Sequence, residues 1–477
     1  SSKTLTSSIE LPRATSFWTL ARAATALRAR TAVNLPTGSV PLRGVSTDTR
    51  AIQRGDLFVA LRGERFDAHD FLADAVARGA GALVVSAPDR AAGLGVPVFG
   101  VDDTLRALGD LARHRRRAWG KPVVAIAGSN GKTTTKELTR AALGSILDVH
   151  ATTGNLNNLV GVPLTLLALP DEADIAIVEL GTNVPGEIAR LRDLAGPQLA
   201  VVTSIGEEHL EGLGSLDQIL TEETSVYDGV DIAVAPGAHP EAVARARATA
   251  RRTVVAGLEG GDISTTAWGV REDGLGWLEV AGVTVRPPLR GAHNVRNAVL
   301  ALAVARECGV SIADAARGIA EMAVPAMRMA WETLGRATLI NDAYNANPPS
   351  MRAALDLLAT LDRGRQRVAV LGTMREMGAH APRLHAELAR YALAAAVDVI
   401  AGVGEMADAL RAEGVDDARV VTAADVDELW TLLEARLASD AVILLKASRG
   451  VRLERIVPRL EQWAGARSAA SGSATNH

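Results

Sequence analysis

Residues 128–133, with the sequence GSNGKT, are the part of the chain that most directly predicts chemistry. Gly128 and Gly131 permit a tight turn in which backbone N–H groups come close to an anion. Lys132 would reach the β- and γ-phosphates of a nucleotide, and the hydroxyl of Thr133 would bind Mg²⁺. The alternative is an ordinary glycine turn that carries an incidental lysine.

The segments on either side of this turn favour the phosphate-binding interpretation. Residues 122–127, PVVAIA, are apolar and rich in β-branched types, which predicts a buried strand. Residues 134–143 have the pattern of a helix, whose N-terminal dipole would point at the same anion. Ile126 stands where the longer pattern G-x-x-x-x-G-K-S/T begins with glycine, so only the shorter form is matched. Together the strand, turn and helix predict a site for ATP or GTP.

Two further polar residues follow predicted strands of the same region. Glu179 ends the apolar run 173–180, and a carboxylate beside a phosphate-binding loop is placed to bind Mg²⁺, although a solvated acid is the alternative. His209 follows the run 199–205 and is a candidate second metal ligand, although a single histidine is usually an ordinary polar residue.

Amides and cations cluster after other predicted strands. Three asparagines crowd the loop at 155–158, which favours ligand recognition, with turn formation the alternative for Asn155. NDAYNANPPSM (341–351) and KASRG (446–450) also follow apolar runs, and cations there suit an anionic ligand or a bound carboxylate. Surface loops between domains are the weaker alternative. The residues concerned are Asn155, Asn157, Asn158, Asp342, Tyr344, Asn345, Asn347, Lys446, Ser448 and Arg449.

Composition limits the classes of protein to which the chain can belong. It has 477 residues, 48% hydrophobic and 22% charged, with a formal net charge of −4, as expected for a globular protein with a large core. We expect no nucleic-acid partner, because the densest basic run, RHRRR at 113–117, is better explained as a solvated helix end. The single cysteine, Cys308, excludes a disulfide within the chain and suits a reducing cytoplasm. No apolar run reaches about 18 residues, so we expect no membrane insertion.

Alternating apolar runs and amphipathic segments predict an α/β protein of about three domains. We place a small N-terminal α/β domain at 1–119 and a central domain with a doubly wound parallel sheet at 120–324. A third α/β domain would occupy 325–465, followed by a disordered tail at 466–477. Short β-rich pieces at 253–288 predict an antiparallel insertion in the central domain.

Seven stretches, taken in order, resemble motifs of the Mur ligase family. They are GSNGKTTTKE, GNLNNLVGVPLTLL, VELGTNVPGEI, HLEGLGS, GAHNVRN, DAYNANPPSM and KASRG. Residues 46–71 are also similar to the uridine-nucleotide domain found in part of that family. The resemblance runs from about residue 19 to about residue 463.

The resemblance implies a ligase of peptidoglycan precursor synthesis with a UDP-substrate domain, a central P-loop ATPase domain and a Rossmann-like C-terminal domain. ATP would phosphorylate the terminal carboxylate of UDP-MurNAc-tripeptide. The amine of D-alanyl-D-alanine would attack this acyl phosphate, and the tetrahedral intermediate would release phosphate to leave UDP-MurNAc-pentapeptide. The family further implies Mg²⁺, a monomer and a cytoplasmic location.

The resemblance also implies roles for individual residues. Catalytic residues would be Lys132, Glu179, His209, Glu223, Arg328 and Lys446. The nucleotide would be bound by Gly128, Ser129, Asn130, Gly131, Lys132, Thr133, Thr134, Asn294, Arg328, Asp342, Tyr344, Asn345 and Asn347. The UDP-linked substrate would be bound by Ser46, Thr47, Thr49, Arg50, Asn155, Asn157, Asn158, Ser448 and Arg449. Metal ligands would be Thr133, Glu179, His209 and Glu223.

Three positions depart from the family's pattern. Many members carry a lysine fourteen positions after the histidine of HLEGxGS, and its carbamoylated form binds a second metal, whereas this chain has Glu223. We hypothesise that Glu223 supplies that carboxylate directly, through a bridging water or a backbone shift, with a solvated helix face of Glu222 and Glu223 as the alternative. Thr373 and Ala447 replace the usual aspartate and glycine, which leaves the local hydrogen bonding and packing open.

Other functions compete with this interpretation. Within the family, the chain could add a single amino acid to the peptide, or act as a folylpolyglutamate synthase. The missing D-N-P-R stretch and the N-terminal nucleotide domain argue against these two. A degenerate homologue that binds nucleotide without turnover is a third alternative, and Glu223 is the feature in its favour.

Overall fold

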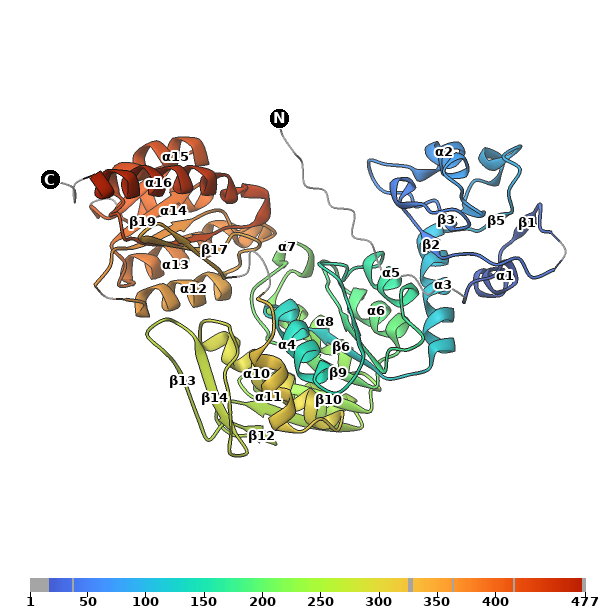
Figure 1. Ribbon diagram of the computed structural model, residues 1–477, viewed down its shortest axis with the longest axis horizontal. Coiled ribbons are helices and arrows are strands. Elements are labelled where there is room, and N and C mark those ends of the chain that lie inside the picture. Colours follow the sequence, from blue (N-terminus) through green and yellow to red (C-terminus); the bar gives the residue numbers. More distant parts are fainter. Residues whose placement is uncertain (1–16, 37, 325–328, 363, 415–416, 474–477) are drawn as a thin grey trace.

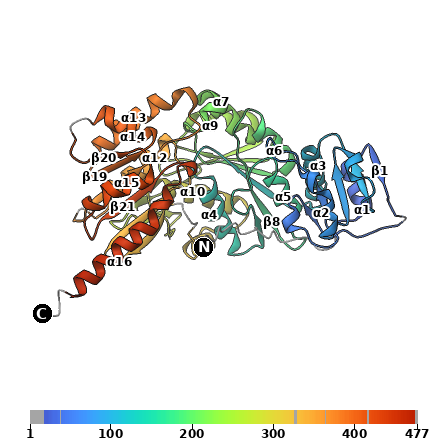
Figure 2. The ribbon, with the colours of Figure 1, turned by 90° about the horizontal axis from the view of Figure 1, so that it is seen from above.

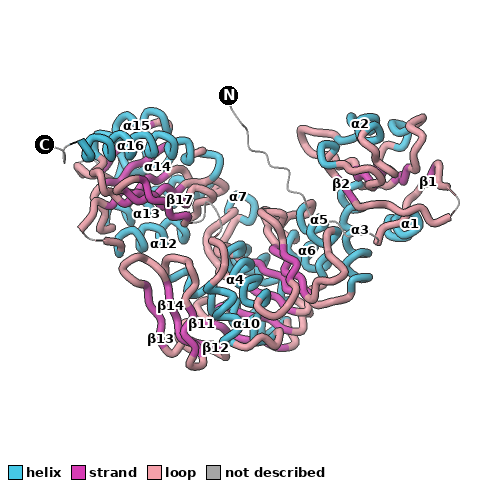
Figure 3. The backbone as a smooth tube through the Cα atoms, viewed as in Figure 1, coloured by secondary structure: helices cyan, strands magenta, loops and turns pink. Residues whose placement is uncertain are grey.

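Three α/β units follow one another along the chain, and each is built around its own main sheet (Figure 1). The computed structural model describes residues 17–36, 38–324, 329–362, 364–414 and 417–473. The N-terminal and C-terminal units lie on opposite sides of the central unit in both views (Figures 1 and 2). Within each unit, helices cover the strands (Figure 3). Across the described ranges, no helix has both the length and the apolar character needed to cross a bilayer.

The N-terminal unit has a five-stranded sheet of order β1-β5-β4-β3-β2. Only β1 runs antiparallel to its neighbour, and β3 and β4 are buried along their whole length. Strand β2 is an edge strand, and the loop with the expected uridine-nucleotide contacts leaves its end. The elements are α1 Leu20–Leu27, β1 Thr31–Val33, β2 Val45–Ser46, β3 Leu57–Val59, α2 Leu72–Ala77, β4 Ala82–Val85, β5 Val98–Gly100 and α3 Thr104–Trp119.

Helix α3 connects the N-terminal unit to the central unit. It begins at an Asp103 cap, which accepts from two backbone N–H groups, and ends at the left-handed Gly120. The expectation that its basic run is a solvated helix end is wrong, because Arg115 and Arg116 are 1% and 6% exposed. Their guanidinium groups donate to the carbonyl oxygens of Leu169 and Ala195, so these charges hold α3 against the central unit.

The central unit has a seven-stranded, all-parallel sheet of order β12-β11-β10-β9-β6-β8-β7. Strand β6 pairs with β8 on one side and β9 on the other, so the chain order reverses there and ligands are expected at its carboxyl end. The elements are β6 Val123–Ala127, α4 Lys132–Gly144, β7 Val149–Ala151, α5 Gly161–Leu167, β8 Ile175–Glu179, α6 Glu187–Ala195, β9 Leu199–Val202, α7 Leu210–Leu213, α8 Leu216–Thr224, β10 Ile232–Pro236, α9 Pro240–Thr249, β11 Arg252–Gly257, β12 Ile263–Ser264, α10 Ala292–Glu307 and α11 Ile312–Ala320.

An antiparallel insertion is present but is shorter than expected. Strands β13 Ala267–Val270, β14 Gly276–Val280 and β15 Val283–Val285 form a separate three-stranded antiparallel sheet. The expectation was wrong for β11 and β12, which pair in parallel with the main sheet. Helix α9 returns the chain before β11, and such a crossover produces parallel pairing.

The C-terminal unit has a six-stranded sheet of order β16-β17-β21-β18-β19-β20, in which only β16 is antiparallel to its neighbour. Asp342 and Lys446 are register partners at the carboxyl ends of β17 and β21, so these two strands bring them together. The elements are β16 Ala330–Leu334, β17 Ala337–Asp342, α12 Pro348–Thr360, β18 Arg367–Leu371, α13 Ala381–Ala394, β19 Val399–Val403, α14 Glu405–Glu413, β20 Val420–Ala423, α15 Val426–Leu433, β21 Val442–Lys446 and α16 Val457–Ser473.

The domain boundaries at 119/120, 324/325 and 465/466 stay predictions. Residues 325–328 lie outside the described residues, and with them the second boundary. Helix α16 runs through most of the segment 466–477, for which the sequence predicts a disordered tail, and residues 474–477 lie outside the described residues.

Candidate functional site

The phosphate-binding loop joins β6 to α4, as its sequence predicts. Gly128 has φ +120°, and a Cβ there would lie 2.4 Å from Oγ1 of Thr203. Gly131 has φ +86° and caps α4, and a Cβ there would lie 2.7 Å from Oδ1 of Asn297. Left-handed backbone and lack of space therefore both require glycine at these positions.

Ser129 and Asn130 fix this loop to the end of strand β9. The N–H groups of Ser129 and Asn130 donate to the carbonyl oxygen and the hydroxyl of Ser204, at 2.8 and 3.0 Å. The hydroxyl of Ser129 also donates to the carbonyl oxygen of Gly206, at 3.1 Å. The geometry of a helix leaves its first N–H groups without an intrahelical acceptor. In α4 these belong to Lys132, Thr133 and Thr134, so they are the groups that can bind an anion.

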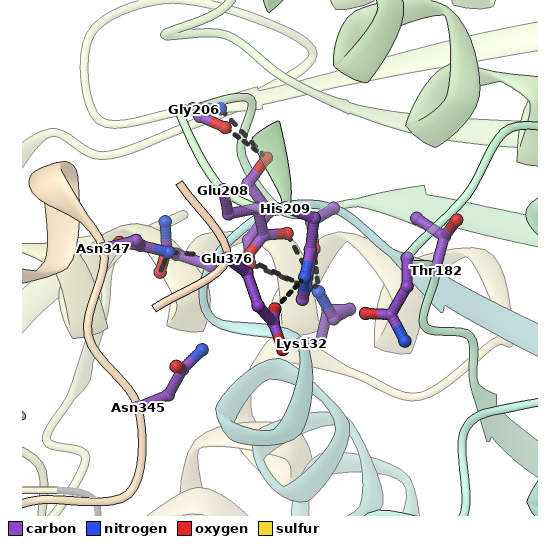
Figure 4. Close-up of polar contacts among 12 residues, drawn as sticks. Lys132, Thr182, Gly206, Glu208, His209, Asn345, Asn347 and Glu376 are labelled. Carbon is purple, nitrogen blue, oxygen red and sulfur yellow. Dashed lines mark hydrogen bonds and ion pairs between the residues drawn. The ribbon is translucent and has the colours of Figure 1, made fainter. Parts of the chain in front are cut away.

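Lys132 lies folded over the loop from which it starts. Its Nζ donates to the carbonyl oxygens of Gly128 and Ser129, at 2.5 and 3.2 Å, and lies 3.4 Å from Oε1 of Glu208 (Figure 4). Burial by itself lowers the pKa of Lys132, but the surrounding carboxylates, Glu208 first, hold it above its ordinary value. The ammonium therefore stays charged and is available to a phosphate group.

Thr133, Glu179 and Asn157 form a buried polar group beside the loop. The Thr133 hydroxyl donates to Oε1 of Glu179 at 3.1 Å, and the Asn157 amide donates to the same oxygen at 2.9 Å. The other oxygen, Oε2, is buried without a hydrogen-bond donor, and its nearest cation is Nζ of Lys136 at 3.8 Å. A hydroxyl and a carboxylate with a free oxygen are ligands that suit Mg²⁺, so these residues fit the metal that the sequence predicts.

Glu223 is fully buried in helix α8, so the alternative of a solvated helix face is wrong. Its Oε2 accepts from the N–H of Gly128 at 2.6 Å, and its Oε1 has no hydrogen-bond partner. Burial raises its pKa to about 7, against the opposing effect of Lys132. Its neighbour Glu222 is also buried and accepts from the N–H groups of Gly186 and Ile188. Glu223 therefore touches the phosphate-binding loop directly.

A second cluster surrounds His209. Its Nδ1 lies 2.5 Å from Oε2 of Glu376 in the C-terminal unit, and its Nε2 lies 3.9 Å from Oε2 of Glu208 (Figure 4). Burial lowers the pKa of His209, but Glu376 and Glu208 hold it above its ordinary value. Burial raises the pKa of Glu208 despite Lys132. Among the described residues, no three His, Cys, Asp or Glu side chains are already arranged as a metal site.

The C-terminal unit contributes a second set of polar side chains. Nζ of Lys446 lies 2.5 Å from Oδ2 of Asp342 and 3.1 Å from the carbonyl oxygen of Asn345. Asn347 caps α12, and its amide donates across the interface to Oδ1 of Asn130 at 2.8 Å and to Oε2 of Glu208 at 3.3 Å. The loop that carries Asn347 therefore meets the phosphate-binding loop.

A cavity of about 990 Å³ is lined by residues of both units. Its lining includes the phosphate-binding loop and also the apolar side chains of Leu258, Trp268 and Leu300. The lining does not include four other expected site residues, Gly128, Glu223, Asn347 and Ser448. The expected site residues that line the cavity are Ser129, Asn130, Gly131, Lys132, Thr133, Thr134, Asn155, Asn157, Asn158, Glu179, His209, Asn294, Asp342, Tyr344, Asn345, Lys446 and Arg449.

Several expected site residues have other surroundings. Ser46, Thr47, Thr49 and Arg50 lie in the N-terminal unit, outside this cavity, where Arg50 pairs with Asp48 at 2.7 Å. Arg328 lies outside the described residues. The side-chain oxygen of Asn158 accepts from the N–H groups of Val160 and Gly161, so this side chain stabilises the turn that precedes α5. The hydroxyl of Ser448 accepts from the Arg375 N–H at 2.9 Å.

Thr373 and Ala447, the two other departures from the family's pattern, both fit their surroundings in the C-terminal unit. The Thr373 hydroxyl accepts from the N–H of Glu405 at 3.0 Å, at the start of α14. Ala447 is fully buried beside Gly372, where a Cβ would lie 2.7 Å from the Cβ of Ala447. The glycine at 372 thus makes room for the methyl group of Ala447.

Glu208 and Glu376 are site residues that the sequence interpretation missed. Glu208 is 3% exposed and contacts Lys132, and it stands next to His209 in the same loop. Glu376 follows the carboxyl end of β18 in the stretch GTMREMG. Both positions follow strands, so the signal that singled out Glu179 and Lys446 was present for them as well.

Models of known families match three consecutive parts of the chain. The Mur ligase family catalytic domain matches residues 41–116, the Mur ligase middle domain matches 126–305, and the Mur ligase glutamate ligase domain matches 327–449. These ranges follow the order of the three units.

Curated proteins and solved structures are similar to the chain over most of its length. The UDP-N-acetylmuramoyl-tripeptide–D-alanyl-D-alanine ligases of Escherichia coli and Bacillus subtilis are 37% and 36% identical to it, over 89% and 88% of this chain and 94% and 93% of theirs. A crystal structure of MurF from Acinetobacter baumannii has a TM-score of 0.86 and 31% identity, covering 93% of this chain and 99% of that one. MurF ligase from Thermotoga maritima in complex with ADP has a TM-score of 0.78 and 27% identity, covering 89% and 98%. The chain therefore belongs to the Mur ligase family of ATP-dependent ligases.

Proposed function

We propose that the protein joins D-alanyl-D-alanine to UDP-MurNAc-tripeptide with ATP and yields UDP-MurNAc-pentapeptide, ADP and phosphate. The names of its curated relatives support this activity. The observation that carries the proposal is one cavity that is lined both by the phosphate-binding loop and by Lys446 and Asn345 of the C-terminal unit. One such cavity can bring a nucleotide and an acceptor carboxylate together.

The chemistry requires activation of a carboxylate, which is a poor acylating agent. Transfer of the γ-phosphoryl group to the peptide carboxylate gives an acyl phosphate with a good leaving group. Attack by the amine of D-alanyl-D-alanine forms the amide bond and expels phosphate. Lys132 would stabilise the charge that develops on the transferred phosphoryl group, because its ammonium is charged and lies against the loop.

Thr133 and Glu179 would hold Mg²⁺, since they already contact each other and Oε2 of Glu179 lacks a donor. The metal would screen the phosphate charges when it is bound. We also propose His209 and Glu223 as ligands of a second Mg²⁺. Three buried carboxyl groups surround Lys132, and burial raises the pKa of two of them, Glu208 and Glu223, so bound cations would favour their charged form.

The N-terminal unit would bind the uridine nucleotide through Ser46, Thr47, Thr49 and Arg50. The peptide would then extend past the asparagine loop toward the cavity. Asn155, Asn157 and Asn158 line that cavity on the central unit. We further propose that the protein acts as a monomer in the cytoplasm, where ATP and nucleotide-linked precursors are found.

The experiment that tests this function measures phosphate release from ATP and Mg²⁺ with UDP-MurNAc-tripeptide. Tripeptides ending in lysine and in diaminopimelate are assayed separately, with and without D-alanyl-D-alanine, and products are identified by mass. We expect release only when both substrates are present, together with the mass of the pentapeptide.

Two results would contradict the proposal. Release that depends on a single free amino acid would assign the protein to a neighbouring branch of the family. Binding of ATP without any phosphate release would indicate a degenerate, nucleotide-binding homologue.

A further inference from the structure

The loop that carries His209 is packed into the C-terminal unit. Leu210 and Leu213 of α7 are buried in one hydrophobic cluster with Met374 and Met377. The N–H of Glu211 donates to the carbonyl oxygen of Glu376 at 3.0 Å. These contacts make the interface part of a core, so His209 and the C-terminal unit are mechanically connected.

His209 and Glu376 both have an unusual backbone conformation. Their φ angles are +49° and +63°, and only seven non-glycine residues in the described part of the chain have positive φ. This conformation is unfavourable for a residue with a side chain and persists only where the surroundings impose it. Two such residues face each other across one interface, with 2.5 Å between Nδ1 of His209 and Oε2 of Glu376.

The imidazole of His209 connects Glu376 to the phosphate-binding side. Nδ1 is buried and forms no aligned hydrogen bond, and its one polar contact in the described structure is this ion pair. The opposite nitrogen, Nε2, lies 3.9 Å from Glu208, which in turn contacts Lys132. A carboxylate on one ring nitrogen fixes both the orientation of an imidazole and the nitrogen that remains free for a ligand.

We propose that Glu376 is a positioning residue for His209: when the C-terminal unit docks, its carboxylate holds Nδ1 as N–H and turns Nε2 toward the Lys132–Glu208 pair. The consequence of this role rests on the proposed function, because Nε2 would then be the nitrogen that binds the proposed second Mg²⁺. Docking of the C-terminal unit and formation of the metal site would thus be one event.

The first test is spectroscopic and needs no turnover. Histidine ring nitrogens are labelled with ¹⁵N and observed at about pH 9, where an imidazole is neutral. The His209 signals are assigned with His209→Gln. We expect the Nδ1–H tautomer in the wild type and a shift toward the common Nε2–H tautomer in Glu376→Gln and, more completely, in Glu376→Ala. An unchanged tautomer in both variants would overturn the proposal.

The second test measures metal affinity by titrating Mn²⁺ into the protein with ADP. A residue that orients a metal-binding histidine typically changes affinity by about 10- to 100-fold. We expect weakening of that order in Glu376→Gln, partial recovery in Glu376→Asp, and an unchanged KM for UDP-MurNAc-tripeptide. Wild-type Mn²⁺ affinity in Glu376→Gln would contradict the proposal.

Glu413→Gln is the matched control, because Glu413 forms an ion pair with Arg390 in the same unit, outside the cavity. It should change neither the tautomer nor the Mn²⁺ affinity, and equal changes in Glu413→Gln and Glu376→Gln would overturn the inference. If the wild type lacks ligase activity but the His209 tautomer depends on Glu376, the proposed function fails while the positioning role stands.

Discussion

Two lysines follow or end parallel strands in two different units, and their surroundings differ: Lys132 is half-buried at the start of α4, and Lys446 is buried at the end of β21. Lys132 lies among Glu208, Glu223 and Glu179, and it contacts two carbonyl oxygens of its own loop. Lys446 has one carboxylate partner, Asp342, at 2.5 Å. The first lysine is thus one cation among several anions, and the second is half of a neutral pair.

This difference indicates different tasks for the two lysines. An excess of buried carboxylate around Lys132 leaves a demand for further positive charge, which a metal–nucleotide complex can meet. A neutral pair has no such demand and instead fixes the loops that carry it. Lysine occurs only five times among the 51 basic residues of the chain, so arginine supplies most other positive charge. A compact ammonium suits both positions.

Replacement of Lys132 should give the largest effect. Lys132→Met removes the cation that would stabilise the transferred phosphoryl group, and we expect kcat to fall roughly 10³-fold. Phosphate release under saturating substrates measures this. Lys121→Met is the control, because Lys121 donates to the backbone carbonyl oxygens of residues 171–173, before β8, and this variant should retain wild-type kcat. A fall in kcat of less than tenfold in Lys132→Met would show that Lys132 does not stabilise the transferred phosphoryl group. The two lysines would then not differ in the way proposed here.

Replacement of Lys446 should act mainly on stability. Lys446→Met leaves the half-buried Asp342 carboxylate without its cation, and we expect the free energy of unfolding to fall by about 3 kcal/mol. Urea unfolding measures this change. The double variant Lys446→Met, Asp342→Asn should recover part of the loss, because no charge is then left unpaired. If Lys446→Met lost activity 10³-fold at unchanged stability, the two lysines would have the same task.

His293 reports on the region between the two lysines. It stands at the start of α10 and lines the cavity, and burial lowers its pKa to about 4, with Asp342 opposing and Lys446 and Arg296 assisting that shift. An unfolded histidine has a pKa of about 6.5, so the unfolded chain binds more protons between these values, and stability falls as pH falls.

The expected contribution of His293 is an acid-induced loss of about 2 kcal/mol at pH 5, and none above pH 7. His293→Gln should therefore lose less stability than the wild type between pH 7 and pH 5, as measured by urea unfolding at both values. Equal losses in the two proteins would show that the buried ring is not what limits stability in acid.

The part of the site that the sequence could predict consists of residues at the ends of buried strands. Apolar runs mark where each buried strand stops, and this places Glu179, Asp342 and Lys446 at the ligand edges of two sheets. The same runs do not encode strand direction, so the sequence places β11 in the antiparallel insertion, whereas it pairs in parallel with β10. Pairing direction is set by the crossover through α9, which is a property of the assembled unit.

Contacts between residues of different units cannot be predicted from the spacing of residues along the sequence. Glu376 and His209 are far apart in the sequence and meet only because α7 packs into the core of the C-terminal unit. Burial of two consecutive glutamates is equally hard to predict, because neighbouring helix residues point about 100° apart. Both Glu222 and Glu223 are buried because α8 packs against α6 and α9 together.

The smallest predicted effect distinguishes the two roles that Glu223 can have beside Lys132. Glu223→Gln retains an oxygen that can accept the Gly128 N–H and removes one negative charge from the cluster. If the charge helps to bind a cation, the Mg²⁺ concentration for half-maximal phosphate release should rise about tenfold, which corresponds to about 1.4 kcal/mol. Glu222→Gln is the control, because Glu222 caps α6 instead. It should change stability but leave the Mg²⁺ requirement of the wild type. Unchanged activity and Mg²⁺ dependence in Glu223→Gln would leave Glu223 as a support for the loop backbone, and of these two residues only Lys132 would then take part in the reaction.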